Sequence, residues 1–320
     1  MTEVYRSAEI AAALANVDLT AAMEAAFLAY SSGRAVVPPV GELLFAEPPG
    51  EVHIKYGYVR GEPYYVIKVA SGFYNHPALG LSSSNGLMLL FSQETGELKA
   101  VLLDEGLLTD HRTAAAGALA ARYFAPPRVD AIGILGTGIQ AELQLRYLAP
   151  VTACRRVLVY GRSEAAIASY QHRLADTNFS ISGVPSTEDF GDCQLIVTTT
   201  PSAAPLLHSV SRGTHVTAVG SDTAGKQELD ARLLAMADVV VVDSRAQSAS
   251  RGEVFQAVRS GKLDMERVSE IGQVIAGERR GRQDAADISI VDLTGVATQD
   301  IAIARAVYER LTAAQPSSLT

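Results

Sequence analysis

The sequence has few cysteines, no excess of basic residues and no recognisable metal-ligand cluster. Its two cysteines, Cys154 and Cys193, form neither a C-x-x-C pair nor a metal-ligand spacing, so we expect reduced, partly buried thiols and no disulfide framework. The formal net charge is −8, which argues against nonspecific nucleic-acid binding because such binding needs a basic surface. We therefore expect no nucleic-acid partner and no metal.

The chain also lacks a long apolar stretch and a basic N-terminal leader. No apolar run approaches the roughly 18 residues of a membrane-spanning helix, and Met1-Thr-Glu-Val-Tyr-Arg6 does not have the pattern of a signal peptide. These absences predict a cytoplasmic protein without a membrane partner. Hydrophobic residues make up 48% of the 320 residues, enough to bury a sizeable core in two domains.

A strand, a glycine turn and a helix follow one another near the middle of the chain. The apolar run 132–135 precedes Gly136-Thr-Gly-Ile-Gln-Ala141, and residues 142–148 continue with a helical pattern. In this G-x-G-x-x-A pattern, Gly136 permits a tight turn, Gly138 lets the backbone approach a pyrophosphate, and Ala141 allows close helix packing. Because the helix N-terminus also attracts phosphate, the pattern predicts a dinucleotide site; the alternative is an ordinary tight turn.

The residues before this stretch predict an α+β domain with an antiparallel sheet. We expect two helices within residues 7–32, the first capped by Ser7, and then extended backbone at Pro38-Pro39. Alternating patterns predict strands at 52–58, 64–70, 87–91 and 98–103, the last two joined by the turn 94–97. An alanine-rich helix at 109–124 follows, and Pro126-Pro127 marks the entry to the next domain.

The residues after the glycine turn alternate between apolar strands and helical patterns. Strands are predicted at 157–160, 195–199, 215–219, 239–242 and 288–293, with helices at 164–174, 228–236 and 254–258 and a surface loop at 277–287. Such alternation predicts a Rossmann-type, doubly wound parallel sheet and hence an α/β protein. We assign residues 126–296 to this domain and 1–125 to the α+β domain, which the C-terminal helix at 297–320 rejoins. The tail from Gln315 is expected to fray.

An arginine, and no acidic residue, follows the second predicted strand of the parallel sheet. In NAD-binding units an acid near this point holds the ribose 2′-hydroxyl, whereas here the order is Tyr160-Gly161-Arg162-Ser163. Gly161 leaves space, and Arg162 could meet a 2′-phosphate or stack on adenine. The pattern permits NADP and does not exclude NAD; the alternative is a surface arginine at a helix start.

Three further residues stand where binding or proton transfer is expected. Arg112 lies in the first turn of its predicted helix, where a cation opposes the dipole, so an anion such as a substrate carboxylate is its expected partner. The alternative is a salt bridge to Asp110 or Asp104. Asp222 follows an apolar strand, a position suited to proton transfer unless it caps a helix. Lys68 interrupts an apolar strand, where a lysine otherwise faces solvent.

Four motifs together resemble the ornithine cyclodeaminase/μ-crystallin family. They are Lys68-Val-Ala-Ser-Gly-Phe73, Leu108-Thr-Asp-His-Arg-Thr-Ala-Ala-Ala116, Gly136-Thr-Gly-Ile-Gln140 and Gly220-Ser-Asp-Thr-Ala-Gly-Lys-Gln-Glu-Leu229. The resemblance covers roughly residues 30–310, and Leu-Thr-x-x-Arg-Thr-Ala-Ala is its most specific part. It implies a homodimer whose N-terminal domain supplies the substrate site and the subunit contact, and a Rossmann domain that binds NAD(P), as NADH or NADPH.

The resemblance also implies roles for individual residues. Lys68 and Arg112 would hold the carboxylate of a small imino or amino acid, and Asp222 would handle protons. With Arg162 and the glycine turn included, the residues expected to line the cofactor are Ser83, Arg112, Gly136, Gly138, Ile139, Gln140, Arg162, Thr200, Val219, Ser221 and Lys226.

Members of this family either cyclise a diamino acid with loss of ammonia or reduce an imine to an amino acid. Ornithine cyclodeaminases carry a glutamate and a methionine ahead of the lysine strand, whereas Lys55 and Gly57 stand near those positions here. Pro38-Pro39-Val40 likewise departs from a proline followed by a substrate-binding arginine. Lys55 would repel a terminal ammonium and, with His53, would suit a second carboxylate; the alternative is that Lys55 faces solvent.

We therefore predict an NAD(P)H-dependent imine reductase that acts on a small, acidic imino acid, most concretely iminosuccinate, which would yield aspartate. The alternatives are an ornithine cyclodeaminase-type ammonia-lyase and a non-catalytic NAD(P)-binding protein of the μ-crystallin type. The presence of Lys68, Arg112 and Asp222 together speaks against the binding-only alternative. The sequence leaves the choice between NAD and NADP, and the direction of the reaction, open.

Overall fold

The computed structural model describes residues 2–73 and 75–313, so the tail from Gln315, predicted to fray, lies outside the described residues. Contacts divide the chain into two units, Met1–Arg112 with Val296–Thr320 and Thr113–Gly295. The division falls within one helix, α3 (Leu107–Phe124), and not at Pro126-Pro127, where we expected it. The reason is packing: Ala121 of α3 lies in an apolar core of the second unit.

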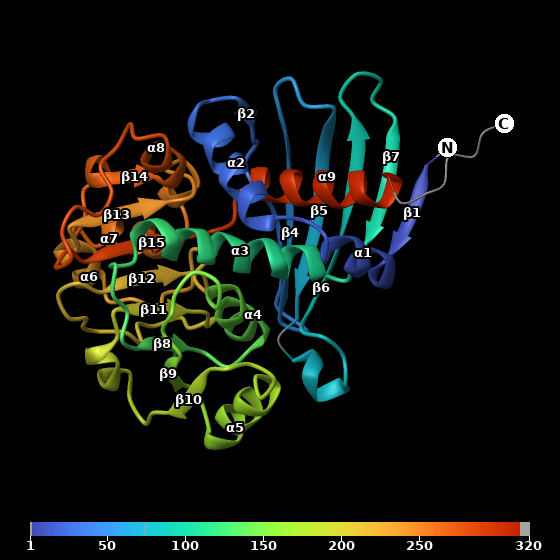
Figure 1. The fold of residues 1–320 in the computed structure, drawn as a ribbon. Helices are drawn as coiled ribbons and strands as arrows, with labels where there is room; N and C mark the ends of the chain where they lie inside the picture. The colour runs from blue at the N-terminus through green and yellow to red at the C-terminus, as the bar shows by residue number, and fades with distance from the viewer. Residues whose placement is uncertain (1, 74, 314–320) are drawn as a thin grey trace. The chain divides into compact units, whose positions relative to one another are not determined.

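The first unit contains a seven-stranded sheet with the strand order β1-β7-β6-β5-β4-β2, in which β3 also pairs with β4. The pairs β4–β5, β5–β6 and β6–β7 are antiparallel, as predicted, whereas β1 pairs with β7 in parallel. Besides the start of α3, the elements of this unit (Figure 1) are β1 (Glu3–Arg6), α1 (Ser7–Leu14), α2 (Leu19–Ser31), β2 (Ala35–Val36), β3 (Gly41–Phe45), β4 (Gly50–Val59), β5 (Tyr64–Gly72), the 3₁₀ helix η1 (His76–Leu79), β6 (Ser84–Ser92), β7 (Leu98–Leu103) and α9 (Ala297–Ala313).

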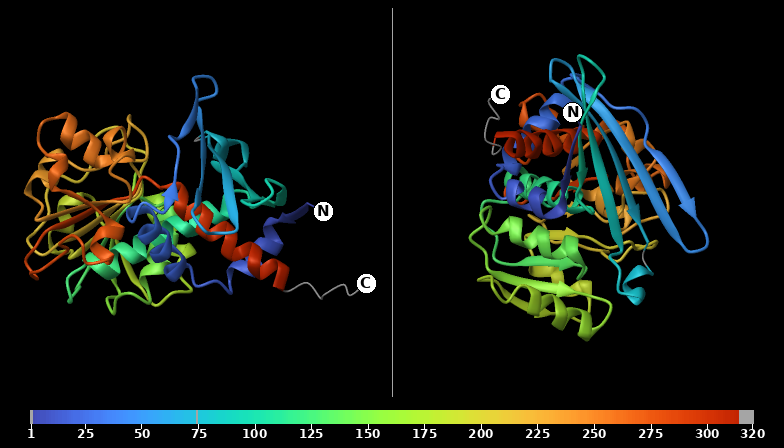
Figure 2. Two further views of the ribbon diagram at one scale, coloured as in Figure 1. Left: turned by 90° about the horizontal axis from the view of Figure 1, so that it is seen from above. Right: turned by 90° about the vertical axis from the view of Figure 1, so that its right-hand side faces the viewer.

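One face of this sheet is covered by helices and the other is not. Helices α1, α2 and α9 lie over the same face (Figure 2), and α9 contacts β4, β5 and β6. Along β4, buried residues on the helical side alternate with exposed ones on the other side. That second face, which no described helix of this unit covers, presents apolar side chains that include Leu43, Phe45, Tyr56 and Tyr58.

Two helices of this unit begin where the sequence did not predict. Arg6, and not Ser7, is the N-cap of α1, and its N–H donates to Glu9 at 3.0 Å. Helix α3 begins at Leu107, because the carboxylate of Asp104 accepts from the N–H of Leu108 at 2.8 Å. Arg112 therefore lies in the second turn of α3, where the helix dipole opposes a cation less than it does in the first.

Three short strands of the first unit, β1, β2 and β3, were not predicted. Each has at most five residues, and β1 is defined by a parallel partner that lies far along the chain.

Among the described helices, no single one is long and apolar enough to cross a membrane. The bent pair α1 and α2 passes that test only when both helices are counted together, by length and composition alone.

The second unit is a doubly wound parallel sheet, as its alternating pattern predicts. Its strand order is β10-β9-β8-β11-β12-β15-β13-β14, and its strand pairs are parallel. The elements of this unit that follow α3 are β8 (Ile132–Leu135), α4 (Ile139–Leu148), β9 (Arg156–Tyr160), α5 (Glu164–Arg173), β10 (Ser180–Gly183), η2 (Thr187–Asp192), β11 (Leu195–Thr198), β12 (His215–Ala218), α6 (Ala231–Met236), β13 (Val239–Val242), η3 (Gln247–Ala249), α7 (Gly252–Arg259), η4 (Met265–Arg267), β14 (Val268–Glu270), α8 (Ile271–Ile275) and β15 (Ser289–Asp292).

The path of the chain through this sheet locates the edge where ligands bind. From β8 the chain moves outward through β9 and β10, and it then returns to β11 on the other side of β8. A topological switch point therefore lies between β8 and β11, and ligands of doubly wound sheets bind at the carboxyl ends of strands beside such a point.

Both cysteines are free thiols that lie in the apolar cores of this unit. Cys154 is 8% exposed and Cys193 is 1% exposed, so they are buried more completely than the sequence predicts. Burial raises the pKa of the Cys193 thiol to about 12. Such a thiol stays protonated near neutral pH and is a poor nucleophile.

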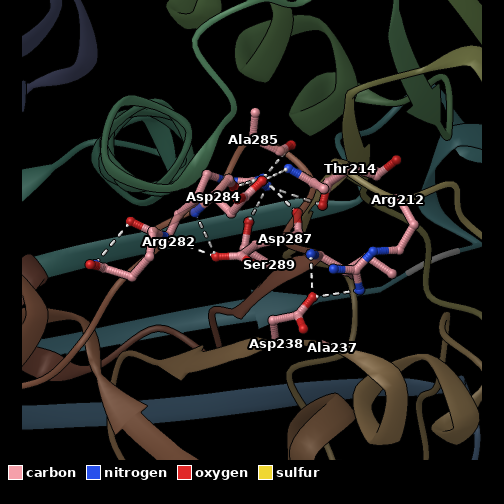
Figure 3. Close-up of polar contacts among 12 residues, drawn as sticks. Arg212, Thr214, Ala237, Asp238, Arg282, Asp284, Ala285, Asp287 and Ser289 are labelled. Carbon is pink, nitrogen blue, oxygen red and sulfur yellow. Dashed lines mark hydrogen bonds and ion pairs between the residues drawn. The ribbon is translucent and has the colours of Figure 1, made fainter.

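The predicted surface loop at 277–287 is a loop, but one of its side chains anchors the opposite edge of the sheet. Arg282 donates to Phe124 O at 2.6 Å, to Thr214 O at 3.2 Å and to Ser289 Oγ at 2.9 Å, as Figure 3 shows for the last two contacts. These acceptors stand at the end of α3 and before or at the start of β12 and β15. Arg282 thus ties together the amino ends of the strands, away from the edge where ligands bind.

Candidate functional site

The glycine turn after β8 has the geometry that its sequence predicts. Gly136 has a φ of +118°, and a Cβ there would lie 2.3 Å from Thr199 Oγ1, so only glycine fits. Gly138 is the N-cap of α4 without a capping side chain, and a Cβ there would meet no atom within 4 Å. Ala141 is fully buried. The N-terminus of α4 is therefore open to an approaching anion.

The carboxyl ends of β8, β11 and β12 meet beside this turn. Thr199 N donates to Leu135 O at 2.9 Å, and Val219 N donates to Thr198 O at 3.0 Å. These bonds bring together at one edge of the sheet seven of the residues predicted to line the cofactor, which are Gly136, Gly138, Ile139, Gln140, Thr200, Val219 and Ser221.

The end of β9 also lies against the glycine turn. A Cβ at Gly161 would lie 2.7 Å from Thr137 Cγ2, so glycine is needed for this close approach. Arg162 follows as an exposed residue, and Ser163 caps α5 by accepting from Ala166 N at 3.2 Å. The predicted contact between Arg162 and a 2′-phosphate stays a prediction.

Asp222 and Lys226 form an ion pair in the loop after β12. Lys226 Nζ lies 2.7 Å from Asp222 Oδ1, and the aspartate side chain is 38% exposed whereas the lysine side chain is 11% exposed. Ser221 Oγ donates to Lys226 O at 2.8 Å, which tightens the loop. The N-cap of α6 is Asp230, so the alternative that Asp222 caps a helix is wrong. Asp222 instead presents a carboxylate at the ligand edge.

A buried glutamate, Glu228, joins the segments that follow β11 and β12. Its carboxylate accepts from Thr198 Oγ1 at 2.7 Å, from Gly220 N at 2.9 Å, and from both the N–H and the hydroxyl of Thr200. A Cβ at Gly220 would lie 2.3 Å from Thr200 O, so the two segments touch. Burial raises the pKa of Glu228 to about 7. The predicted helix at 228–236 begins only at Ala231 because Glu228 is used in this way.

In the first unit, Lys68 and Arg112 meet at one buried carboxylate, that of Asp300 in α9. Lys68 Nζ lies 2.9 Å and Arg112 Nε 3.2 Å from Asp300 Oδ1, and none of the three side chains is more than 8% exposed. Arg112 Nη1 also donates to Gln299 Oε1 at 3.0 Å. Lys68 therefore does not face solvent, and the ion pair of Arg112 with Asp300 was not among the predicted alternatives.

Lys55 is buried on the same face of the sheet as Lys68. It stands directly opposite Lys68 in the β4–β5 pair and is only 6% exposed, so the alternative that it faces solvent is wrong. We call Lys55, Lys68, Arg112 and Asp300 the cation cluster. Three cations surround one carboxylate in this cluster, which makes it a candidate site for an anionic ligand.

His53 and Ser83, two other predicted site residues of the first unit, lie outside the cation cluster. His53 Nδ1 lies 3.5 Å from Glu42 and Nε2 lies 3.7 Å from Glu51. These carboxylates weaken the predicted role of His53 in binding an anion. Ser83 lies between η1 and β6, where its carbonyl accepts from Phe73 N at 2.7 Å.

Comparison with known sequences identifies the family to which this chain belongs. The sequence model of the "Ornithine cyclodeaminase/mu-crystallin family" matches residues 1–315. This chain belongs to the ornithine cyclodeaminase/mu-crystallin family. The resemblance inferred from the four motifs is thereby confirmed, and so is the α/β fold class, with its parallel sheet in one unit and its α+β arrangement in the other.

Relatives within the ornithine cyclodeaminase/mu-crystallin family align over both units. An uncharacterized cyclodeaminase, y4tK, of Sinorhizobium fredii is 39% identical over 301 residues, which are 92% of this chain and 91% of that protein. An archaeal alanine dehydrogenase dimer with bound NAD is 34% identical, with a TM-score of 0.88 over 98% of this chain and 96% of that one. The iminosuccinate reductase of Paracoccus denitrificans in complex with NAD⁺ is 32% identical, with a TM-score of 0.85 over 97% and 96%.

Three polar residues of this family member were missed by the sequence interpretation. Asp300 and Gln299 stand 232 and 187 residues along the chain from Lys68 and Arg112, so no local pattern links them. The available signal was the polar run 298–300, which lies in the first turn of the last predicted helix and is fully buried in the structure. Glu228 was interpreted as a helix start, and its four hydrogen bonds become visible only in the folded chain.

The open space at Gly138 allows a direct test of the glycine turn. Gly138→Val should lower NADH affinity about 10- to 100-fold, because the side chain displaces an anion whose charge-assisted hydrogen bonds contribute about 1.5–3 kcal/mol. The melting temperature should change little, since a Cβ at Gly138 meets no atom within 4 Å. Fluorescence titration measures the affinity. Gly191→Val, at another glycine with open space, is the matched control, and equal NADH affinity in both variants would contradict the assignment.

Proposed function

We propose that this protein is an NAD(P)H-dependent imine reductase that forms a small amino acid, with iminosuccinate to aspartate as the concrete reaction. The observation that carries the proposal is the cation cluster, where Lys55, Lys68 and Arg112 are each buried. Lys68 and Arg112 contact the carboxylate of Asp300, and the charge of Lys55 also acts on it. A second substrate carboxylate would gain a charge-assisted hydrogen bond there, worth about 1.5–3 kcal/mol.

The enzyme class rests on the family. The protein is an NAD(P)-dependent oxidoreductase that acts on imino or amino acids, as its aligned relatives with bound NAD or NAD⁺ support. The relative from Paracoccus denitrificans supports the dicarboxylic substrate, because it is an iminosuccinate reductase. Neither relative decides between NADH and NADPH. We propose that Arg162 allows NADPH to bind by tolerating its 2′-phosphate.

Each group of residues receives one role in the proposed reaction. The reduced nicotinamide, when bound, supplies a hydride to the imine carbon. Lys68 and Arg112 hold the α-carboxylate of the substrate, and Lys55 holds the second carboxylate. Asp222 handles the proton that the substrate nitrogen needs, with Lys226 paired to its Oδ1 at 2.7 Å. Gly136, Gly138, Ile139, Gln140, Thr200, Val219 and Ser221 are proposed to line the cofactor at the ligand edge of the parallel sheet, along with Arg112, Ser83 and Lys226.

Lys55 also weighs against a diamino acid as substrate. An ornithine side chain would bring a fourth positive charge to a cluster with three cations and one carboxylate. Repulsion and desolvation of a buried like charge would weaken binding by several kcal/mol, on the order of 10³-fold. The positive charge of Lys55 therefore counts against the cyclodeaminase alternative.

A substrate screen tests the reaction directly. Oxidation of NADH and of NADPH is followed with oxaloacetate plus ammonia, with pyruvate plus methylamine, and with cyclic imino acids, and release of ammonia from ornithine is measured in parallel. The four-carbon dicarboxylic imine should be the best substrate. Efficient release of ammonia from ornithine would contradict the reductase proposal, and NAD(P)H binding without turnover of any substrate would favour the binding-only alternative.

The role of Lys55 is tested by reversing its charge. Lys55→Glu should raise KM for the imine of oxaloacetate at least about tenfold more than KM for the imine of pyruvate, because only the former loses a charge-assisted hydrogen bond. Steady-state kinetics on both substrates measure the ratio. Lys55→Met, which removes the charge without reversing it, should give an intermediate ratio. Equal losses on the two substrates would remove Lys55 from the site.

A homodimer through the first unit is part of the same proposal. The uncovered face of its sheet is apolar, and Leu43, Phe45, Tyr56 and Tyr58 on it are 37% to 54% exposed. Apolar patches of this kind on a folded protein mark contact surfaces. The related archaeal alanine dehydrogenase is a dimer, which supports a second copy of this chain as the partner.

A further inference from the structure

Asp300 contacts both of the cations that are proposed to bind the substrate α-carboxylate. Its Oδ1 lies 2.9 Å from Lys68 Nζ and 3.2 Å from Arg112 Nε. Because one oxygen receives both cations, the ammonium and the guanidinium are held next to each other, as a bound carboxylate requires. The Oδ2 atom of Asp300 has no hydrogen-bond partner among the described residues.

Charged groups from three elements act on Lys68 and Asp300. They include Lys55 on β4, Arg112 on α3 and Asp104 after β7. Burial raises the pKa of Asp104, which reduces its negative charge. The carboxylate of Asp300, at 2.9 Å from Lys68 Nζ, is therefore the main group that favours the ammonium form of Lys68.

We propose that Asp300 is a positioning residue, which holds Lys68 and Arg112 in place for the substrate carboxylate and keeps Lys68 positively charged. This inference rests on the proposed function, because it deepens the role of the cation cluster. Asp300 acts through the two cations and takes no part in hydride or proton transfer. Gln299 supports the arrangement from the same helical turn, since its Oε1 accepts from Arg112 Nη1 at 3.0 Å.

The direction of the pH effect follows from the groups around Lys68. Burial lowers the pKa of Lys68, and Asp300 is the largest influence that raises it again. Without the charge of Asp300, the pKa of Lys68 falls further, so the ammonium is lost at a lower pH. Carboxylate binding needs the ammonium and therefore weakens as pH rises through the pKa of Lys68. Removal of Asp300 should move that loss of affinity to lower pH.

The experiment measures the affinity of the full-length protein, saturated with NADH, for succinate, a dicarboxylate that cannot be reduced. Calorimetric titrations between about pH 6 and pH 10 compare the natural protein with Asp300→Asn. The midpoint at which affinity is lost should move at least about one pH unit lower in the variant, since one opposite charge at contact shifts a pKa by about 1–3 units. At the lowest pH the variant should bind at least as tightly, because its neutral amide does not compete with succinate for the cations.

Three further comparisons separate positioning from a merely structural role. Asp300→Glu keeps the charge and should restore the midpoint of the natural protein to within about 0.5 pH unit. Glu62→Gln removes another carboxylate that pairs with α9, through Arg305, and should leave the midpoint unchanged. In a Lys68→Met background the loss of affinity with rising pH should disappear, and Asp300→Asn should not change the pH dependence, because the titrating group through which it acts is gone. Thermal unfolding monitors the fold of each variant.

The outcomes distinguish this inference from the proposed function. A midpoint that does not move in Asp300→Asn, or no binding of succinate by the natural protein, would overturn this inference. A shifted midpoint in a protein that reduces no imine would uphold the positioning role and remove the proposed reaction. A shifted midpoint together with turnover of the dicarboxylic imine would support both.

Discussion

Replacement of Asp222 by asparagine is expected to lower kcat for imine reduction about 10²- to 10⁴-fold, the range that a positioned general acid or base contributes. The amide has the shape of the carboxylate but does not ionise near neutral pH, so it cannot act as a general acid or base. NADH affinity should change little, because Asp222 is assigned to the proton and not to the cofactor. Stability should change little as well, since the Asp222 side chain is 38% exposed and solvent screens its ion pair with the less exposed Lys226.

Rapid-mixing kinetics with the dicarboxylic imine measure this loss. The matched control is Asp230→Asn in the same unit, because Asp230 is the N-cap of α6 and asparagine caps helices about equally well. That variant should keep its activity within about twofold. A folded Asp222→Asn protein with full activity would show that another group, or water, handles the proton.

The second large effect is expected at Glu228. Glu228→Gln should lower the free energy of unfolding by about 2–4 kcal/mol, because an amide NH₂ group faces donors at one end of the side chain and buried donors without acceptors cost about 1–3 kcal/mol each. Thr198, Thr200 and Gly220 supply those donors. Their displacement should also weaken NADH binding at least about tenfold.

The contribution of Glu228 to the free energy of unfolding is expected to decrease as pH rises. The pKa of Glu228 is raised in the folded protein, from 4.5 to about 7, so the folded state binds the proton more tightly than the unfolded state does. The stability from this group is therefore complete below pH 4.5 and is lost as pH rises to about 7. The glutamine variant lacks this contribution, so the difference in stability between the two proteins should shrink over that window.

Urea denaturation at several pH values measures the difference. Glu188→Gln, at an exposed glutamate of η2, should have no effect at any pH. A stability difference that is small and constant from acid to neutral pH would show that Glu228 is not the link between the two segments. Unchanged NADH affinity would show that the link does not matter for the cofactor.

The parts of the site that are local in sequence could be predicted, and the parts that depend on tertiary contacts could not. The turn from Gly136 to Ala141 was predicted in detail because strand, turn and helix are neighbours along the chain. Asp300 was missed because its pairing with Lys68 spans 232 residues. The first turn of α3 was misplaced by two residues because the side chain that starts it, Asp104, precedes the helix and its effect is visible only in the fold.

The burial of Lys55 and Lys68 could not be predicted from the sequence. Lys55 and Lys68 alternate with apolar residues, a pattern that fits a solvent-facing or a buried side chain equally well. Helix α9 covers that face of the sheet, and it comes from the far end of the chain. The sequence alone therefore could not say that these lysines are buried, although it correctly predicted that they stand in strands.

The return of the chain to its first unit sets an order for biosynthesis. Residues 113–295 form an uninterrupted segment, so all the strands of the nucleotide-binding sheet have been made before α9 exists. Lys68 and Arg112 can pair with Asp300 only after α9 has been synthesised. Domains generally fold as units during synthesis, so the nucleotide-binding unit is expected to form first. A chain that terminates just before Val296 would then hold a complete nucleotide-binding unit, but the sheet of its first unit would lack the helix that covers Lys55 and Lys68. Such an uncovered sheet is expected to be a target for quality-control proteases.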